Sequence, residues 1–223
     1  MLMLQTLDYV FSNAERNNPK SILQTIDNFV LESGQFLMNV GPEKGEILKN
    51  HLLKSEPNNV IELGTFIGYS AVLISSTIGE KSQLTSIDSD IHSIEIAKEL
   101  INFAGLDHKV NLMHGSAEEI IPKLNFIADF VFIDHAKKKY LSDLKLLESK
   151  GIIVKNSVVF ADNVGIFKDE MAEYFDHVRE SGEYLSQNFS SKLEYRNNIY
   201  DACLLYTSPS PRDSRVSRMP SSA

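Results

Sequence analysis

The feature that most constrains the fold is a regular alternation of short apolar runs with longer helical patterns between residues 59 and 160. Each run is short enough to be a buried strand, and the segments between runs repeat their apolar residues at helical spacing. The runs are residues 60–61, 84–87, 110–113, 130–133 and 158–160. Right-handed helical crossovers between parallel strands account for this order. We therefore predict an α/β fold with one doubly wound, mostly parallel sheet that carries helices on both faces.

Helical spacing also marks the segments that flank this alternation. Residues 4–14, 22–30 and 42–52 precede the first strand and predict three helices, the third opened by Pro42. After the last parallel strand, a helix is expected at about 169–180. Two further strands, at 184–189 and 193–200, lie close enough in sequence to pair as a late antiparallel hairpin.

The end of the chain differs in composition from the rest. Residues 203–223 hold six serines and three of the seven prolines, end in Arg-rich sequence and lack a periodic apolar pattern. We therefore predict one domain at residues 1–202 and leave residues 203–223 outside it, as a tail that is disordered or foreign to the native protein. A native flexible tail that binds a partner is the alternative.

Charge and composition narrow the class of partner. The formal net charge of −8 disfavours nucleic acid, because binding to a phosphate backbone depends on Lys and Arg. The sequence has no apolar run long enough to span a bilayer and no basic, cleavable leader at its start. Cys203 is the single cysteine, which fits a reducing compartment. We expect a cytoplasmic monomer that binds a small molecule, with no nucleic-acid or membrane partner.

A glycine-containing turn follows the first predicted strand, with Gly64 and Gly68 four residues apart. Glycines at a strand-to-helix turn let the backbone approach a ligand, and the next helix offers free N–H groups, although a simple tight turn is the alternative. Asp88 ends the second strand 20 residues after Gly68. A carboxylate there can accept hydrogen bonds from ribose hydroxyls, unless it is merely a solvated strand end. Together these features predict a nucleoside ligand.

Acidic and amide side chains follow the fourth and fifth predicted strands, at Asp134, Asp162 and Asn163. The carboxyl ends of parallel strands are where open α/β sheets bind ligands, and hard oxygen donors suit Mg²⁺. Either aspartate alone could cap the following helix. Lys137 follows the fourth strand, where burial near a divalent cation would make it a base at neutral pH. The alternative for Lys137 is a solvated surface lysine.

In combination, these residues resemble the catechol O-methyltransferase family from about Leu7 to Ala202. The stretches that carry the resemblance are residues 36–41, 61–71, 102–106, 132–135, 161–164 and 193–195. The resemblance implies a Rossmann-like methyltransferase fold, S-adenosylmethionine as methyl donor and Mg²⁺ as second cofactor. The implied reaction moves a methyl group to one hydroxyl of a catechol that chelates the metal.

The resemblance also implies a role for individual residues. Asp134, Asp162 and Asn163 would bind the metal, and Lys137 would be the catalytic base. The substrate site would comprise Met38, Lys137, Asn163 and Glu194, with Glu194 binding the second hydroxyl. The cofactor would contact Val40, Glu62, Gly64, Ser70, Asp88, Gly115, Ala117, Glu118 and Asp134.

Departures from the family pattern leave alternatives open. The family is aromatic where this chain has Ala136 and carries tryptophan where it has Phe36, so catechol selectivity is in question. Other vicinal-dihydroxy aromatics are alternative substrates. An NAD-dependent dehydrogenase is a rival enzyme class, since Asp88 suits its ribose, but the glycine spacing and the second acidic strand end count against it. A noncatalytic nucleoside-binding module is a third possibility, against which Lys137 and Glu194 count.

Overall fold

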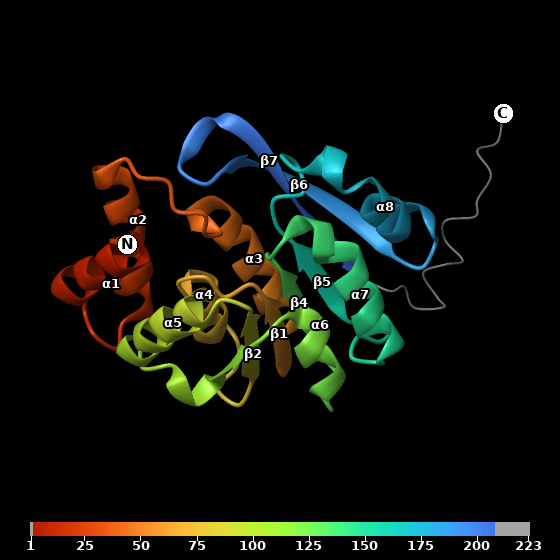
Figure 1. The fold of residues 1–223 in the computed structure, drawn as a ribbon, viewed down its shortest axis with the longest axis horizontal. Helices are drawn as coiled ribbons and strands as arrows, with labels where there is room; N and C mark the ends of the chain where they lie inside the picture. The colour runs from red at the N-terminus through yellow and green to blue at the C-terminus, as the bar shows by residue number, and fades with distance from the viewer. Residues whose placement is uncertain (1, 208–223) are drawn as a thin grey trace.

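The computed structural model describes residues 2–207, which form one sheet flanked by helices (Figure 1). The helices are α1 (Leu2–Asn13), α2 (Pro19–Ser33), α3 (Gly41–Ser55), α4 (Tyr69–Thr77), α5 (Ile91–Phe103), α6 (Ala117–Ile120), α7 (Tyr140–Ser149) and α8 (Ala172–Phe175). The strands are β1 (Asn59–Leu63), β2 (Gln83–Asp88), β3 (Val110–His114), β4 (Phe130–Ile133), β5 (Val158–Ala161), β6 (Leu185–Leu193) and β7 (Arg196–Thr207).

The sheet has the strand order β3-β2-β1-β4-β5-β7-β6. The strands from β3 to β5 are mutually parallel, and β7 runs antiparallel to both β5 and β6. The predicted mostly parallel sheet with a late antiparallel hairpin is confirmed. Because the chain leaves β1 toward β2 and later returns to β4 on its other side, a topological switch point lies between β1 and β4, where such sheets bind ligands.

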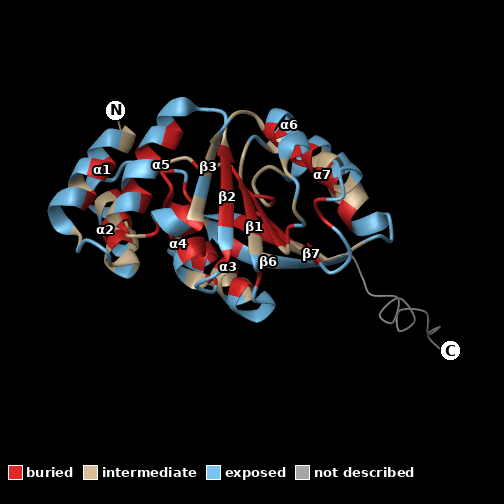
Figure 2. Cartoon of the chain, turned by 90° about the horizontal axis from the view of Figure 1, so that it is seen from below, coloured by how far each residue is buried: buried red, intermediate tan, exposed pale blue. Residues whose placement is uncertain are grey.

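Both faces of the sheet are buried beneath helices. Successive strand residues point to opposite faces, so Val60 packs with the apolar cluster of α1 to α5 and Ile61 packs with that of α6 to α8. Phe132 and Ile133 divide between the two clusters in the same way. In Figure 2 the buried residues concentrate in the central strands and on the helix faces turned toward them. The predicted doubly wound arrangement follows from this pattern of burial.

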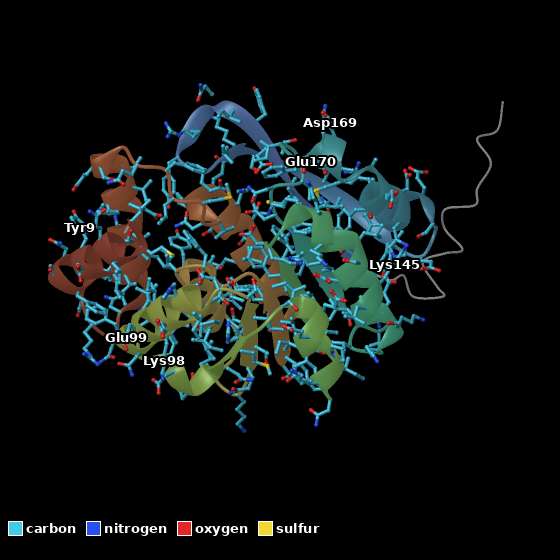
Figure 3. All side chains as sticks on the ribbon, viewed as in Figure 1. Tyr9, Lys98, Glu99, Lys145, Asp169 and Glu170 are labelled. Carbon is cyan, nitrogen blue, oxygen red and sulfur yellow. The ribbon has the colours of Figure 1, made fainter. Side chains whose placement is uncertain are left out.

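Charged side chains occupy the outer faces of the helices. Figure 3 shows Lys98 and Glu99 of α5 and Lys145 of α7 at the periphery, and all three are exposed. Within residues 2–207, no helix combines the length and the apolar character needed to cross a membrane.

Helix α3 bears on the site because one charged residue lies on its buried face. The predicted apolar residues Leu48 and Leu52 are almost fully buried, and Lys44, one turn earlier on the same side of the helix, is 1% exposed. The long stem of Lys44 therefore passes through the interior toward the carboxyl edge of the sheet, and its ammonium group must find partners there.

The C-terminal hairpin differs from the prediction in the position of its turn. A loop was expected between residues 189 and 193, but β6 continues to Leu193 and the chain reverses at Glu194 and Tyr195. Tyr195 has a φ of 56°, in the left-handed region that such a tight turn uses. The helix predicted at 169–180 is present only as short turns, of which α8 is the one α-helical piece in that stretch.

The domain also extends further toward the C-terminus than the predicted boundary at residue 202. Strand β7 runs through the boundary placed after Ala202, and its residues up to Thr207 pair with β5. Cys203, Leu204 and Tyr206 are each at most 1% exposed. The apolar side chains of this segment complete the core beside β5, although the serines and prolines that follow favoured a boundary after Ala202. The remainder of the predicted tail, residues 208–223, lies outside the described residues.

Candidate active site

A cavity of about 350 Å³ opens at the carboxyl ends of β1, β2, β3 and β4, on the edge predicted to bind ligands. It is lined by the predicted cofactor residues Gly64, Asp88, Gly115, Ala117, Glu118 and Asp134, together with Leu63, Phe66, Ile87, Ser89, Ser116, His135, Ala136, Lys139 and Asp143. The three other predicted cofactor residues, Val40, Glu62 and Ser70, are buried and do not line this cavity. The structure thus gathers most of the predicted nucleoside site around one pocket.

Glycine at position 64 is required by the approach of two loops. Gly64 has a φ of 101°, and a Cβ atom there would lie 2.5 Å from the backbone oxygen of Asp134. No side chain fits, so the loop after β1 can contact the loop after β4 only with glycine at this position. This contact brings the predicted cofactor loop against the predicted metal ligand.

Asp88 holds the loop after β1 in place. One carboxylate oxygen, Oδ2, accepts hydrogen bonds from the backbone N–H groups of Thr65 and Phe66, each at 2.9 Å. The other, Oδ1, accepts one from Asp90 at 2.9 Å. A carboxylate has about four acceptor positions, so Oδ1 retains room for a further donor. The observed role of Asp88 is therefore structural, and its contact with a ribose stays a prediction.

Glu62 lies beneath this loop and is fully buried. Burial raises the pKa of Glu62 to about 8, while hydrogen bonds from the hydroxyls of Ser70 and Ser86 act in the opposite direction. Its Oε1 atom is buried and has no hydrogen-bond partner among residues 2–207. Glu62 thus has an unpartnered carboxyl oxygen in the protein interior, next to Ser70 at the start of α4.

Lys137 is fixed beside the predicted metal ligand Asp134. Its Nζ atom donates to Asp134 Oδ1 at 2.9 Å and to the Tyr140 hydroxyl at 2.7 Å. The same nitrogen lies 5.9 Å from the ring centre of Phe167. The Tyr140 hydroxyl is in turn close to the backbone oxygens of Ile133 and Asp162, at 2.9 and 3.1 Å. Lys137 is therefore held in place, which disfavours the alternative of a solvated surface lysine.

Asp162 is completely buried at the end of β5. Its Oδ1 atom lies 2.7 Å from Lys44 Nζ and accepts hydrogen bonds from the backbone N–H of Asn163 and the thiol of Cys203, at 2.7 and 3.3 Å. In contrast, its Oδ2 atom is buried and has no partner within the described part of the chain. A buried carboxylate oxygen without a donor is costly unless a cation binds it.

Asn163 is oriented by two carboxylates. Its Nδ2 atom donates to Glu194 Oε1 at 3.0 Å and to Asp201 Oδ2 at 2.8 Å. Since ionised carboxylates only accept hydrogen bonds, this end of the amide must be the NH₂ group, and the amide oxygen is turned the other way. The oxygen is thereby available as a ligand.

Lys44 and Asp201 complete the cluster, and neither was predicted as a site residue. Lys44 Nζ lies 2.9 Å from Asp201 Oδ2 and also contacts Glu194 and Asp162. Burial by itself lowers the pKa of Lys44, but the three carboxylates outweigh it and raise the pKa above its ordinary value. Burial likewise raises the pKa of Asp201, and Lys44 and its hydrogen bonds lower it below the ordinary value. These two residues are therefore charged partners in the interior.

The donor set around Asp162 fits a hard divalent cation. Asp134 and Asp162 supply carboxylate oxygens and Asn163 an amide oxygen, and Mg²⁺ favours such ligands. The unpartnered Asp162 Oδ2 is the observation that supports this fit, since its partner is otherwise missing among residues 2–207. Burial raises the pKa of Asp134, as expected for a carboxylate that lacks sufficient positive charge nearby.

The predicted substrate residues differ widely in exposure. Met38 is 48% exposed, in the segment that leads into α3. Glu194 Oε2 is buried without a partner among the described residues, and burial raises the pKa of Glu194 to about 7. Ala136, in contrast, lines the cofactor cavity with Asp88 and Glu118. Position 136, which is aromatic in the family, thus lies on the wall of the predicted cofactor cavity.

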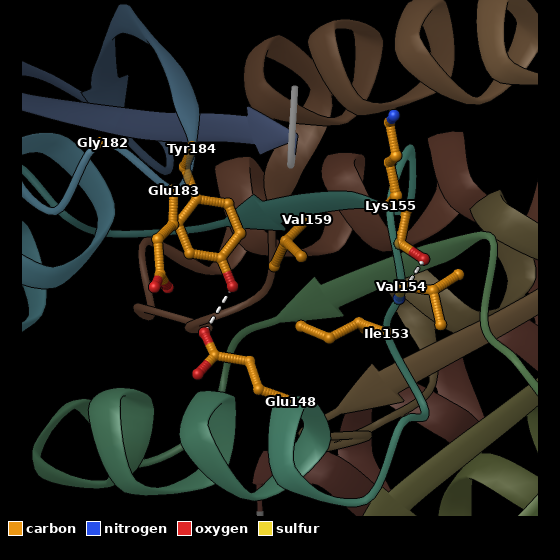
Figure 4. Close-up of a pocket in the computed structure, with 9 residues that line it drawn as sticks. Glu148, Ile153, Val154, Lys155, Val159, Gly182, Glu183 and Tyr184 are labelled. Atoms are coloured by element: carbon orange, nitrogen blue, oxygen red, sulfur yellow. Dashed lines mark hydrogen bonds between the residues drawn. The ribbon is translucent and has the colours of Figure 1, made fainter. Parts of the chain in front are cut away.

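A second cavity, of about 460 Å³, lies elsewhere (Figure 4). It is bounded by residues 153–157, which precede β5, and by Tyr184, whose hydroxyl donates to Glu148. His177 Nε2 contacts the same Glu148 oxygen at 2.7 Å. None of the predicted site residues lines it. Because it opens near the amino end of β5, this cavity is away from the edge where parallel sheets bind substrates.

Known proteins resemble the chain in both sequence and structure. Residues 12–196 match the O-methyltransferase family. Catechol O-methyltransferase B of Danio rerio is 37% identical over 194 residues, covering 85% of this chain and 72% of that protein. The Transmembrane O-methyltransferase homolog of Mus musculus is 32% identical over 213 residues, covering 92% and 81%. The O-methyltransferase TomG of Streptomyces achromogenes, solved in complex with SAM, has a TM-score of 0.73 at 19% identity, covering 84% and 89% of the two chains, a likeness of fold.

Proposed function

The chain belongs to the O-methyltransferase family, and we propose that it transfers the methyl group of S-adenosylmethionine to one hydroxyl of a catechol in a Mg²⁺-dependent reaction. The observation that carries the proposal is the convergence of Asp134, Asp162 and Asn163 beside Lys137 and Glu194. Family membership also removes the dehydrogenase alternative. The names of relatives such as catechol O-methyltransferase B of Danio rerio support the substrate class.

Asp134, Asp162 and Asn163 would hold the metal. When bound, Mg²⁺ supplies Lewis acidity that lowers the pKa of a coordinated hydroxyl and provides a template for two neighbouring oxygens. The carboxylates and the amide contribute the fixed geometry, because Asn163 is held by two hydrogen bonds and Asp162 by three contacts on its other oxygen. Little reorganisation would then accompany substrate binding.

Lys137 acts as the base in this proposal. Its Nζ atom, held by Asp134 and the Tyr140 hydroxyl, takes the proton from the hydroxyl that is to be methylated. The proton then resides on Nζ, and the deprotonated oxygen is free to form a bond to the methyl group that S-adenosylmethionine would supply, with the S–CH₃ bond broken and S-adenosylhomocysteine as the leaving product. Tyr140 and the nearby ring of Phe167 keep the lysine oriented and partly shielded from water.

Glu194 binds the second hydroxyl. Its Oε1 atom is engaged by Asn163 and Lys44, and the unpartnered Oε2 atom can accept a hydrogen bond from a substrate. The cofactor occupies the cavity lined by Gly64, Asp88 and Gly115, which adjoins Asp134. The methyl donor would thus lie on one side of Asp134, at the end of β4, and the acceptor on the other. Most of the rate enhancement would come from this positioning.

A methyl-transfer assay with paired substrates tests the proposal. We expect turnover of a simple catechol that requires Mg²⁺ and stops in excess chelator, and no comparable turnover of a phenol with one hydroxyl, because chelation needs two neighbouring oxygens. Turnover of both substrates at similar rates, or full activity in chelator, would contradict it. Comparing a catechol with larger vicinal-dihydroxy aromatics then distinguishes the alternative substrate class.

A further inference from the structure

Lys44 and Asp201 form a buried ion pair next to the proposed metal ligands. Lys44 comes from α3 and Asp201 from β7, and their exposed fractions are 1% and 4%. The Nζ to Oδ2 distance is 2.9 Å, between residues 157 positions apart in the sequence. Removing two charged groups from water at this depth costs free energy. A specific role for the pair next to the site would account for this cost.

Asp201 uses its whole capacity to accept hydrogen bonds. Its Oδ2 atom accepts from Lys44 Nζ at 2.9 Å and from Asn163 Nδ2 at 2.8 Å. Its Oδ1 atom accepts from the backbone N–H groups of Gly165 and Ile166, each at 3.1 Å. Four donors fill the acceptor positions of one carboxylate. Asp201 therefore fixes both the side chain of Asn163 and the loop that follows it.

The loop itself is tightly seated on Asp201. A Cβ atom at Gly165 would lie 2.6 Å from the backbone nitrogen of Ala202 and 2.9 Å from the Cα of Asp201. No side chain can be inserted there, so the backbone after Asn163 lies directly against β7. The direction of the Asn163 amide oxygen thus depends on β7 through both a side-chain and a main-chain contact.

Lys44 fills the centre of an acidic cluster. Asp162, Glu194 and Asp201 each bring an oxygen within 4.8 Å of the others, an arrangement that could itself hold a cation. The ammonium group already contacts all three carboxylates. A divalent cation is therefore directed to the other side of Asp162, where Oδ2 lacks a partner within residues 2–207.

We propose that Lys44 and Asp201 are positioning residues for the divalent cation. Asp201 orients the Asn163 oxygen toward the cation, and Lys44 occupies the neighbouring acidic cluster so that the cation binds at a single place. The inference rests on the proposed function, because it takes the cation to be held by Asp134, Asp162 and Asn163. Both residues act through the ligands and touch neither substrate nor cofactor.

Asp201→Asn tests the orienting role with little change in volume. An amide offers one acceptor end and one donor end, so its NH₂ group must face either the donors Lys44 and Asn163 or the N–H groups of Gly165 and Ile166. We expect the affinity for Mn²⁺, measured by the electron paramagnetic resonance of the free ion, to fall about 10–100-fold, as for other residues that support metal ligands. The affinity for S-adenosylmethionine without metal should stay within about twofold, since Asp201 is remote from that cavity.

Lys44→Met tests the second role, and Lys49→Met is its matched control. Lys49 lies on the same helix, in an exposed pair 3.7 Å from Glu46. Without the ammonium group, the three buried carboxylates lose their counter-charge, so we expect a lower melting temperature in chelator, its recovery in Mn²⁺, and a second Mn²⁺ bound per chain. Lys49→Met should show none of these changes.

The outcomes separate this inference from the proposed function. If the parent chain methylates catechol and binds Mn²⁺, but Asp201→Asn binds Mn²⁺ as tightly as the parent, the inference is wrong and the proposed function stands. One bound Mn²⁺ and an unchanged melting temperature in Lys44→Met would likewise overturn the role of Lys44. A parent chain that binds no Mn²⁺ overturns both proposals. If Lys44→Met does not fold, Asp201→Asn, checked by its cofactor affinity, decides the question.

Discussion

Truncation after Ala202 is expected to unfold the domain, whereas truncation after Thr207 is expected to be harmless. The shorter chain loses the part of β7 that pairs with β5, including the buried residues Cys203, Leu204 and Tyr206. Burying a large apolar side chain contributes about 1.5–3 kcal/mol, so Leu204 and Tyr206 together contribute on the order of 3–6 kcal/mol, to which the small side chain of Cys203 adds less. Native domains are stable by roughly 5–15 kcal/mol, and the loss is of the same size.

Thermal unfolding followed by circular dichroism measures this difference. Chains ending at 202 and at 207 are compared with the full chain, and we expect the chain ending at 202 to be unfolded or insoluble, with the edge of β5 exposed. A chain ending at 202 that melts within a few degrees of the chain ending at 207 would refute the reasoning. In the full chain, Leu204→Ala should cost about 2–5 kcal/mol. Leu185→Ala, 51% exposed on β6, is its matched control and should change little.

Three further predictions concern single residues of the site. Lys137→Met should lower kcat by roughly 10²–10⁴-fold and leave the affinity for S-adenosylmethionine nearly unchanged, which stopped-flow and titration measurements would separate. Glu62→Gln should become more stable relative to the parent as pH rises from about 5 to 8. Below its raised pKa of about 8, the folded parent keeps the Glu62 proton that the unfolded chain has already released, so the parent loses stability as pH rises. A difference in melting temperature that does not vary with pH would contradict this. Ala136→Trp should tighten S-adenosylmethionine binding roughly two- to tenfold through stacking and leave the KM for catechol unchanged, whereas an effect on catechol alone would return position 136 to the substrate rim.

Much of the fold could be predicted because its signals are local. The five parallel strands are short apolar runs. The four inner strands β2, β1, β4 and β5 are buried on both faces, whereas the edge strand β3 is only partly buried, so an apolar run by itself was enough to mark each of them. The resemblance to catechol O-methyltransferase and the enzyme class are confirmed by the family match. The end of β7 fell outside the predicted domain because Leu204 and Tyr206 stand next to sequence of different composition, and pairing with β5 makes them core residues.

The site residues also differ in whether the sequence near them marks their role or whether that role depends on contacts distant in the chain. Gly64, Asp88, Asp134 and Asp162 stand at strand ends, where topology brings them together. Lys44 carried a weak signal, since it falls in line with Leu48 and Leu52 on the buried stripe of α3, but a helical lysine is ordinarily exposed. Asp201 carried none, because its role depends on Asn163 and on a loop more than 30 positions away.

The charges around Asp162 account for the kind of cation that the site would bind. The carboxylates are those of Asp134, Asp162, Glu194 and Asp201. In the resting site, before Lys137 gives up the proton that its proposed role as base requires, the ammonium groups are those of Lys44 and Lys137. Four negative charges against two positive ones leave an excess of two when all six groups are ionised. Burial makes this excess costly, and it raises the pKa of Glu194 to about 7. A monovalent cation would offset only half of this negative excess. Without Lys44 the excess would be three charges, so even a divalent cation would leave one negative charge uncompensated. In the proposed role of Lys44, the lysine that keeps a cation out of the acidic cluster would thus also set the remaining charge at the value that Mg²⁺ would neutralise.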